Sequence, residues 1–276
     1  MPTHDPRRLS RRRFLTAGSA IAIVGAGDVF ALEPRWLEVT THRVSVPTLP
    51  HALEGYTVAQ LTDVHLESFG VLHRAIARAV QAHDPQLVVL TGDVIDSERR
   101  LPVLETLVDS LRGNGRAIAA TMGNWEHWGE VRPLVLSRAY ARSGAQLLSN
   151  ESRTLGDLPI AATDDHYTEH ADVAATFRDV SRGVPYLFLT HAPGLFDQLP
   201  DLTPRFALGL AGHTHGGQVR LGTRAIWVPP ASGRFVSGSY ETAHGPVYVS
   251  RGIGTSIAPV RLMCRPELAM FTLTRG

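Results

Sequence analysis

The sequence predicts an α/β protein in which strands and helices alternate along the chain. After about residue 55, short apolar runs typical of buried strands alternate with segments whose apolar residues recur with helical spacing. Several strand segments run directly into an Asp, Asn or His. Ligand sites in open α/β sheets form at the carboxyl ends of strands, so these polar residues predict one shared functional site.

Five predicted strands each end at a possible metal ligand. Each is a short run of mainly apolar residues, and the polar residue follows within two positions. Five such coincidences favour a common site over chance placement in loops. The pairs are 56–62 before Asp63, 86–91 before Asp93, 117–122 before Asn124, 185–190 before His191 and 206–211 before His213.

Helical spacing is visible in four segments between these strands. Leu72, Ile76 and Val80 share one face of a helix predicted near 71–83, and similar patterns occur near 102–112, 134–140 and 173–180. From about residue 218 onward, Gly and Pro separate short β-type runs, the last of which are 247–250 and 268–273.

The composition excludes several classes of protein. All 27 basic residues are Arg, so a P-loop lysine, a Schiff-base lysine and a Ser-x-x-Lys centre are excluded. The net charge of +1 argues against nucleic-acid binding, which requires a strongly basic surface. A single Cys excludes an intramolecular disulfide and a Cys-rich zinc site. The 13 His residues are the unusual part of the composition.

Residues 1–31 have the features of a bacterial export signal. The run from Ser10 to Leu15, Ser-Arg-Arg-Arg-Phe-Leu, resembles the twin-arginine (Tat) consensus. A weakly apolar stretch to Ala31 follows; it is too short for a confident transmembrane helix, and it predicts cleavage after Ala31. The alternative is a basic tail beside a buried helix.

This signal predicts a domain of residues 32–276 that the Tat export machinery delivers to the periplasm or cell envelope. Without residues 1–31 the chain keeps 22 Arg and 24 acidic residues, a net charge of −2. The positive charge of the full chain therefore belongs to the predicted signal.

The residues that follow the strands are typical transition-metal ligands. Mixed carboxylate, amide and imidazole donors suit Mn, Fe, Zn or Co rather than an all-oxygen calcium site. In an extended segment, residues i and i+2 project to the same side. We therefore expect Asp63 with His65, and His213 with His215, each to converge on a metal.

These segments resemble the motifs of the calcineurin-like metallophosphoesterases. The family motifs are DxH, GDxxD, GNH[DE], a lone His and GHxH. The resemblance covers Tyr56 to Gly276, and the run from Gly212 to Gln218 is most similar to the exported or membrane-associated bacterial branch. It implies a four-layer α/β/β/α sandwich with the site at the strand carboxyl ends. The matching segments are Asp63–His65, Gly92–Asp96, Gly123–His127, His191 and Gly212–His215.

The resemblance implies two divalent metal ions, of Mn, Fe, Zn or Co. Carried over residue by residue, it places Asp63, His65 and His215 at the first metal. Asn124, His191 and His213 would hold the second, and Asp93 would bridge both. A hydroxide between the metals would attack the phosphorus atom, so catalysis would need no Ser, Cys or Lys nucleophile.

One position departs from the family pattern. The family has a His after the Asn, where it stabilises phosphoryl charge or protonates the leaving group; here that residue is Trp125, whose indole only donates a hydrogen bond. His127 is a candidate replacement for the catalytic His, His166 is another, and the alternative is that His127 lies outside the site. Without an acid, we expect substrates with good leaving groups.

Trp125, Asp165 and Arg251 are candidate substrate-binding residues. Asp165 follows a predicted strand at 158–163, and its alternative role is in a turn. Arg251 suits a phosphate oxygen, although pairing with a carboxylate is the commoner role of Arg.

The resemblance implies hydrolysis of a phosphodiester, pyrophosphate or phosphomonoester. A lipid-linked or UDP-diacylglucosamine-like substrate and a membrane surface are expected partners. The alternative is a non-catalytic metal-binding envelope protein that retains the fold.

Overall fold

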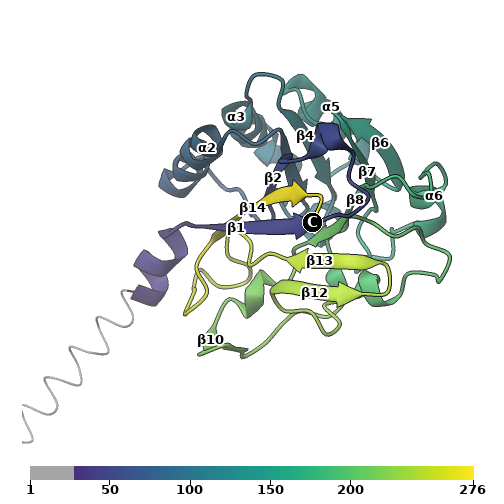
Figure 1. The fold of residues 1–276 in the computed structure, drawn as a ribbon. Coiled ribbons are helices and arrows are strands. Elements are labelled where there is room, and N and C mark those ends of the chain that lie inside the picture. The colour runs from purple at the N-terminus through teal and green to yellow at the C-terminus, as the bar shows by residue number, and fades with distance from the viewer. Residues whose placement is uncertain (1–27) are drawn as a thin grey trace, which may run out of the picture.

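Two six-stranded β-sheets pack face to face in the computed structural model, which describes residues 28–276 (Figure 1). The first has the order β1 (Glu38–Ser45), β14 (Glu267–Thr274), β2 (Thr57–Leu61), β3 (Leu87–Thr91), β4 (Ala117–Thr121) and β5 (Gln146–Leu147). The second has the order β12 (Gly238–Thr242), β13 (Gly245–Val249), β9 (Leu208–Ala211), β8 (Leu187–Leu189), β7 (Leu158–Ala162) and β6 (Glu151–Leu155). A separate hairpin joins β10 (Arg220–Leu221) and β11 (Arg224–Ala225).

The centre of each sheet is parallel. β2, β3, β4 and β5 run parallel to one another, as do β7, β8, β9 and β13. Strands buried on both faces read as continuous apolar runs, which is why β3, Leu-Val-Val-Leu-Thr, was predictable. This arrangement brings the carboxyl ends of β2, β3 and β4 together at one edge of the first sheet.

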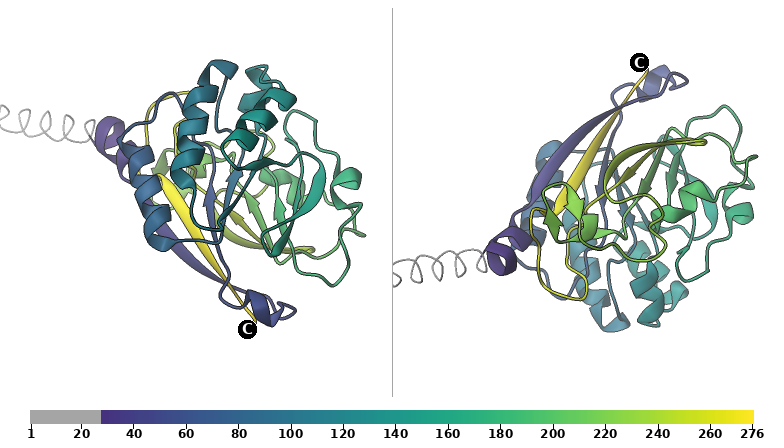
Figure 2. Two further views of the ribbon diagram at one scale, coloured as in Figure 1. Left: turned by 90° about the horizontal axis from the view of Figure 1, so that it is seen from above. Right: turned by 90° about the horizontal axis from the view of Figure 1, so that it is seen from below.

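Helices cover the outer faces of the two sheets (Figure 2). The first sheet is covered by α2 (Val71–His83), α3 (Leu101–Leu111) and α5 (Pro133–Arg142), whose apolar faces pack on it in one core cluster. The second sheet is covered by the short helix α6 (Val173–Phe177) and the 3₁₀ helix η5 (Pro193–Asp197). The predicted four-layer sandwich is confirmed, with a thin fourth layer.

The two sheets are joined by an apolar core and by polar contacts near the strand ends. Between the sheets, Val58 and Phe271 of the first pack in one cluster with Leu187 and Leu210 of the second. The buried side chain of Gln60 donates hydrogen bonds to the carbonyl of Ala211 across the interface and to the hydroxyl of Thr91, both at 3.0 Å. These bonds fix the strand ends of one sheet against those of the other.

The structure adds elements that the sequence pattern did not indicate. β1 has an irregular, largely polar sequence and forms because it pairs in parallel with β14 along eight residues. A short helix, α4 (Asn124–Trp128), follows β4 directly. The remaining short helices are η1 (Asp28–Leu32), η2 (Glu33–Arg35), η3 (His51–Leu53), η4 (Glu98–Arg100) and η6 (His215–Gly217).

Most of the predicted export signal, residues 1–27, lies outside the described residues, so the Tat signal and the boundary at Ala31 stay predictions. Within the described part of the chain, every helix is too short or too polar to cross a bilayer.

Candidate metal centre

The five predicted strand ends meet in one buried centre between the two sheets. Two groups of side chains there bring ligand atoms within 4.8 Å of one another. β2, β3 and β4 deliver Asp63, Asp93 and Asn124 from the first sheet, and β8 and β9 deliver His191 and His213 from the second. The two groups are Asp63, His65 and His215, and Asp93, His191 and His213.

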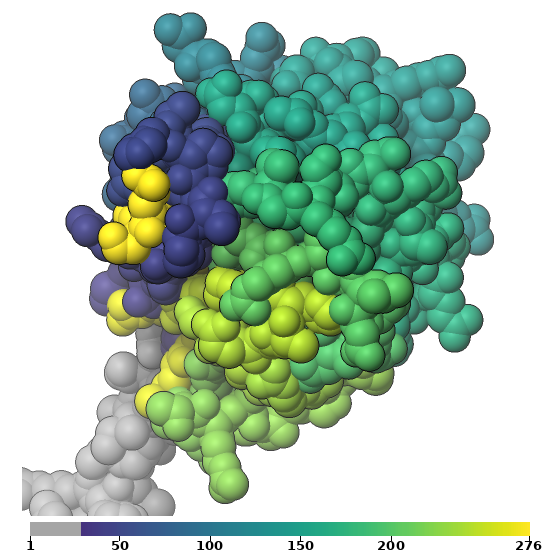
Figure 3. Space-filling view, turned by 45° about the vertical axis from the view of Figure 1, so that its right-hand side comes forward, coloured from purple at the N-terminus to yellow at the C-terminus, as the bar shows by residue number. Residues whose placement is uncertain are grey.

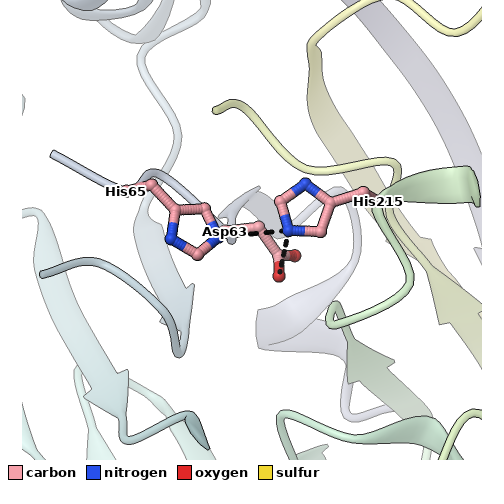
Figure 4. A group of neighbouring side chains, drawn as sticks. All are labelled: Asp63, His65 and His215. Atoms are coloured by element: carbon pink, nitrogen blue, oxygen red, sulfur yellow. Dashed lines mark hydrogen bonds and ion pairs between the residues drawn. The ribbon is translucent and has the colours of Figure 1, made fainter. Parts of the chain in front are cut away.

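The ligand atoms of the first group point toward one another, and hydrogen bonds among them cannot satisfy all three at once. The Nε2 atoms of His65 and His215 lie 3.1 Å apart, and the His215 Nε2 lies 3.4 Å from Asp63 Oδ1 (Figure 4). Two imidazole nitrogens and a carboxylate directed at the same point form a donor set that a divalent transition metal satisfies. The residues of this group therefore fit a metal ion.

The second group has the same character. His191 Nε2 lies 3.1 Å from Asp93 Oδ2, 3.2 Å from Asn124 Oδ1 and 3.3 Å from His213 Nδ1. Asn124 thus adds an amide oxygen to the carboxylate and the two imidazoles. This set of two nitrogen and two oxygen donors also fits a divalent transition metal.

Asp93 stands between the two groups. Its Oδ2 lies 3.1 Å from His191 Nε2 and 3.9 Å from His65 Nε2, so one carboxylate oxygen faces imidazoles of both sets. Its Oδ1 accepts a hydrogen bond from the Trp125 backbone N–H at 2.8 Å, which fixes the carboxylate plane. This is the position that a bridging ligand requires.

Backbone carbonyls orient two of the imidazoles. His191 Nδ1 lies 2.8 Å from the Thr91 carbonyl, and His213 Nε2 lies 2.7 Å from the Pro230 carbonyl. Because a carbonyl only accepts, these nitrogens carry protons, so the other nitrogen of each ring is the one that would ligate a metal when the ring is neutral. This is the tautomer that binds a metal.

The expectation of extended segments at Asp63–His65 and His213–His215 is wrong. Asp63, His65, His213 and His215 all have left-handed φ angles, of 51°, 45°, 70° and 49°, and Asp93 has a φ of 53°. Non-glycine residues rarely adopt this conformation, and such strain is concentrated at functional sites. The side chains of each pair converge because the chain coils tightly after the strand, rather than by strand alternation.

Neighbouring backbone groups hold these strained loops in place. The backbone N–H groups of Asp63 and His65 donate to the carbonyls of Gly92 and Asp93 at 3.1 Å and 3.0 Å. Gly212, which precedes His213, must be glycine because a Cβ there would overlap the side chains of Thr62 and Asp63. The loops after β2, β3 and β9 therefore support one another.

Electrostatics keep Asp93 in its ligating form. Burial raises the pKa of Asp93, but the charge and hydrogen bond of His191 outweigh burial and lower it below its ordinary value. Asp63 has fewer compensating contacts, so burial raises its pKa to about 7. A cation next to Asp63 would offset this burial cost, because opposite charge favours the ionised carboxylate.

Glu126 is a structural residue of the centre to which the sequence analysis gave no role. Its buried carboxylate accepts backbone hydrogen bonds from Asp93 at 3.0 Å, Val94 at 2.6 Å, Ile95 at 3.1 Å and Gly123 at 2.9 Å. It thereby ties the loop after β3 to the start of α4. At the start of α4, Glu126 supplies the half of a capping box in which the third helical residue accepts from the N-cap backbone N–H, here that of Gly123.

The structure does not bring His127 into the centre. Its Nε2 lies 2.6 Å from Asp164 Oδ1, and its ring stacks on His170 at 3.9 Å. Trp125 and Trp128 are three residues apart and share one face of α4, whereas a residue two positions from Trp125 points to the opposite side. Neither His127 nor His166 lines the cleft beside the metal ligands, so this geometry does not support His127 as the replacement for the missing catalytic His, and that role stays a prediction.

Two of the predicted substrate-binding residues are committed elsewhere. Arg251 makes ion pairs with Glu38 at 3.0 Å and Glu267 at 3.1 Å, joining the loop after β13 to β1 and β14. Asp165 is buried in the turn after β7, where its Oδ2 accepts hydrogen bonds from the backbone and hydroxyl of Thr168. Neither residue lines the cleft beside the metal ligands. Arg251 therefore has the alternative role of pairing with carboxylates, and Asp165 has the alternative role in a turn.

Trp125, the third predicted substrate-binding residue, lines a cleft of about 570 Å³ that opens beside the metal ligands. The volume is in the range of small-molecule sites. Asp93, Asn124, His213 and His215 form its polar floor. Its walls are mainly apolar and aromatic, and they include Trp125, Trp128, Tyr167, Ile226, Trp227, Pro229, Pro230, Ile257, Ala258 and Val260.

Tyr167 is a cleft residue that the sequence did not reveal. Its ring packs edge-on against His213, with centroids 5.4 Å apart, and against Trp128 at 5.5 Å. It brings a phenolic hydroxyl to a wall that is otherwise mainly apolar.

Comparison with known proteins agrees with this geometry. The family profile described as calcineurin-like phosphoesterase matches residues 56–217, more than half of the chain. The chain is 29% identical to the metallophosphoesterase YkuE of Bacillus subtilis, over 97% of this chain and 98% of that protein. It is 25% identical to the phosphodiesterase YaeI of Escherichia coli, over 96% and 99% of the two chains. It is also 28% identical to a bovine transmembrane protein with a metallophosphoesterase domain, over 97% of this chain and 63% of that protein. The chain therefore belongs to the calcineurin-like phosphoesterase family and is a metallophosphoesterase.

Proposed function

We propose that the protein hydrolyses a phosphodiester or pyrophosphate that carries an apolar group, using two divalent metal ions. The observation that carries this proposal is that residues of both metal-ligand groups line the floor of a cleft whose walls are mainly apolar. The ligands would bind the phosphoryl group, and the cleft walls would bind the apolar substituent.

The residues fit the two metals as follows. Asp63, His65 and His215 would hold one, and Asn124, His191 and His213 the other, with Asp93 shared. Two such metals supply an activated water nucleophile and neutralise charge on the phosphoryl oxygens. The mixed nitrogen and oxygen donors accept Mn, Fe, Zn or Co alike, so availability would decide which is bound.

The protein itself supplies orientation of the ligands and an apolar surface beside them. The Thr91 and Pro230 carbonyls fix two imidazoles, and Glu126 fixes the backbone that carries Asp93. Trp125 packs edge-on against His65, with ring centroids 5.5 Å apart, and covers the centre from the cleft side. A phosphoryl group would therefore reach the ligands with its apolar substituent along Trp125 and Trp128.

The apolar wall can be tested through substrate preference. Replacing Trp227 or Ile257 by Ser should raise KM for a diester with a long alkyl chain by about tenfold. The apolar contact of either side chain with the alkyl chain would contribute roughly 1.5 kcal/mol or more to the binding free energy. KM for a small, water-soluble diester should change little. Leu202→Ser, exposed and away from the cleft, is the matched control. Equal effects on both substrates would contradict the proposed role of the wall.

The absence of a catalytic His at position 125 predicts a dependence on the leaving group. Trp125→His should raise the rate for diesters with poor leaving groups by up to about 10²-fold, because a general acid contributes on that order. Diesters with good leaving groups should respond much less. Trp128→His, on the same face of α4, serves as the control. An unchanged rate ratio between poor and good leaving groups would reject this interpretation.

A non-catalytic metal-binding envelope protein is the second candidate function. The altered position 125 favours it, whereas the convergence of seven ligand residues favours an enzyme. Assay of the full chain with an aryl phosphodiester and added Mn²⁺ separates the two. Turnover that depends on the metal supports the enzyme, and metal binding without turnover supports the alternative.

We also propose that residues 1–31 direct the chain through the Tat machinery to the periplasm or cell envelope. The twin-arginine run and the apolar stretch after it support this proposal. The nearly balanced charge supports a small or lipid-linked phosphorylated substrate rather than nucleic acid.

A further inference from the structure

The mouth of the cleft is surrounded by an exposed apolar surface. In the described residues, thirteen large apolar side chains are exposed, and seven of them fall in three short segments of the predicted domain, 32–36, 218–228 and 255–265. Such clustering marks an interaction surface, whereas scattered apolar residues do not. We call this surface the apolar rim; it consists of Leu32, Trp36, Leu221, Ile226, Trp227, Ile257 and Met263.

Backbone hydrogen bonds join the three segments into one surface. The N–H of Arg220 donates to the carbonyl of Leu262 at 3.0 Å, which joins the segments 218–228 and 255–265. The buried carboxylate of Glu33 accepts from the N–H of Met263 at 2.9 Å. Figures 1 and 3 show the β10 hairpin and the loop before β14 on the side of the molecule where the described chain begins.

The apolar rim is continuous with the proposed substrate site. Ile226, Trp227 and Ile257 are each more than half exposed and also line the cleft that ends at the metal ligands. A molecule bound along the rim would therefore extend into the cleft that ends at the metal ligands.

The charge of this region is the reverse of that of the whole domain. The segments 32–36, 218–228 and 255–265 contain five Arg and one acidic residue, Glu33, whereas residues 32–276 carry a net charge of −2. Among the described residues, Arg35, Arg220, Arg224 and Arg265 form no ion pair with a carboxylate. The guanidinium of Arg265 instead stacks over the ring of Trp36 at 3.8 Å.

We propose that the apolar rim docks on the surface of an anionic phospholipid bilayer. The apolar side chains would enter the interfacial region, and the unpaired Arg residues would contact lipid phosphates. Trp and Arg are suited to this boundary because each combines an apolar body with a polar end. If the cleft binds the substrate as proposed above, the substrate is a phosphoester lipid that the protein takes directly from the membrane.

The test measures binding of the full chain to phosphatidylcholine vesicles with and without phosphatidylglycerol, by sedimentation. We expect binding to the anionic vesicles that weakens as salt rises. Leu221→Ser/Met263→Ser, which lies outside the cleft, should bind at least about tenfold more weakly. Arg224→Gln/Arg265→Gln should lose about 30-fold on anionic vesicles and little on neutral ones.

Val71→Ser/Leu134→Ser is the matched control, because these equally exposed residues lie on the helical layer, and it should bind as the wild type does. Wild-type affinity in the rim variants would overturn the proposal, because binding would then reside elsewhere in the chain. Absence of vesicle binding by the wild type, or formation of a dimer that the rim variants abolish, would overturn it as well. Hydrolysis of a water-soluble diester should be unchanged in every variant, so failure of docking is distinguishable from failure of the proposed function.

Discussion

Replacement of Asp93 by Asn is expected to lower metal-dependent phosphodiester hydrolysis by about 10³-fold or more. The Asp93 carboxylate faces imidazoles of both ligand groups, and Asn would remove its charge and leave one oxygen. Loss of a metal removes several kcal/mol of transition-state stabilisation, and each 1.4 kcal/mol corresponds to a factor of about ten. Steady-state kinetics with a chromogenic diester and saturating Mn²⁺ measures the effect.

Asp201→Asn provides a control for the same chemical change at an exposed position. The Asp93 variant should retain the circular dichroism spectrum of the wild type. A folded Asp93→Asn protein with wild-type turnover would show that this residue does not hold the metals.

Replacement of Glu126 by Ala is expected to destabilise the fold by about 3 kcal/mol or more. The change removes the acceptor of four buried backbone N–H groups, and each unsatisfied buried donor costs roughly 1–3 kcal/mol. For a chain of this size, that corresponds to a fall in Tm of about 6–12 °C. Differential scanning calorimetry with and without Mn²⁺ measures the change.

Glu98→Ala is the matched control for Glu126. Glu98 bonds Arg132 at the surface, where solvent screens the ion pair and leaves it little net effect on stability. Glu126→Gln, which keeps one acceptor oxygen, should lie between the wild type and the Ala variant. If Glu126→Ala had the stability of Glu98→Ala, the backbone of the loop after β3 would not depend on this carboxylate.

The parts of the fold that the sequence predicted are those with a strong local pattern. β2, β3, β4, β8 and β9 are buried runs, and α2, α3 and α5 have clear apolar faces. β1 was missed because its largely polar sequence becomes a strand only by pairing with β14, more than two hundred residues away. Long-range pairing of this kind leaves no local signal.

The positions of the site residues were predictable, but their backbone geometry and contacts were not. Ligands at the ends of parallel strands must meet, which topology alone dictates. The left-handed conformation of Asp63 and Asp93 depends on hydrogen bonds between loops, and that information is not local to either segment. The direction of His127 follows from the short helix α4, whose five residues are too few to show helical spacing.

The roles of Arg251 and Tyr167 illustrate the same limit. Arg251 lies in the loop directly after β13, but its partners Glu38 and Glu267 come from two other strands. Tyr167 reaches the cleft from the turn after β7, a segment with no recognisable motif. Residues that depend on tertiary contacts were therefore misassigned or missed, while the metal-ligand motifs were found.

The central claim is that this protein is a two-metal hydrolase, and titration of the metal-stripped full chain with Mn²⁺ tests it most directly. Calorimetric binding and diester turnover are followed in the same samples. The account predicts that turnover is absent without metal and reaches its maximum when two ions are bound per chain. Saturation at a single ion, or turnover that persists in the stripped protein, would contradict it.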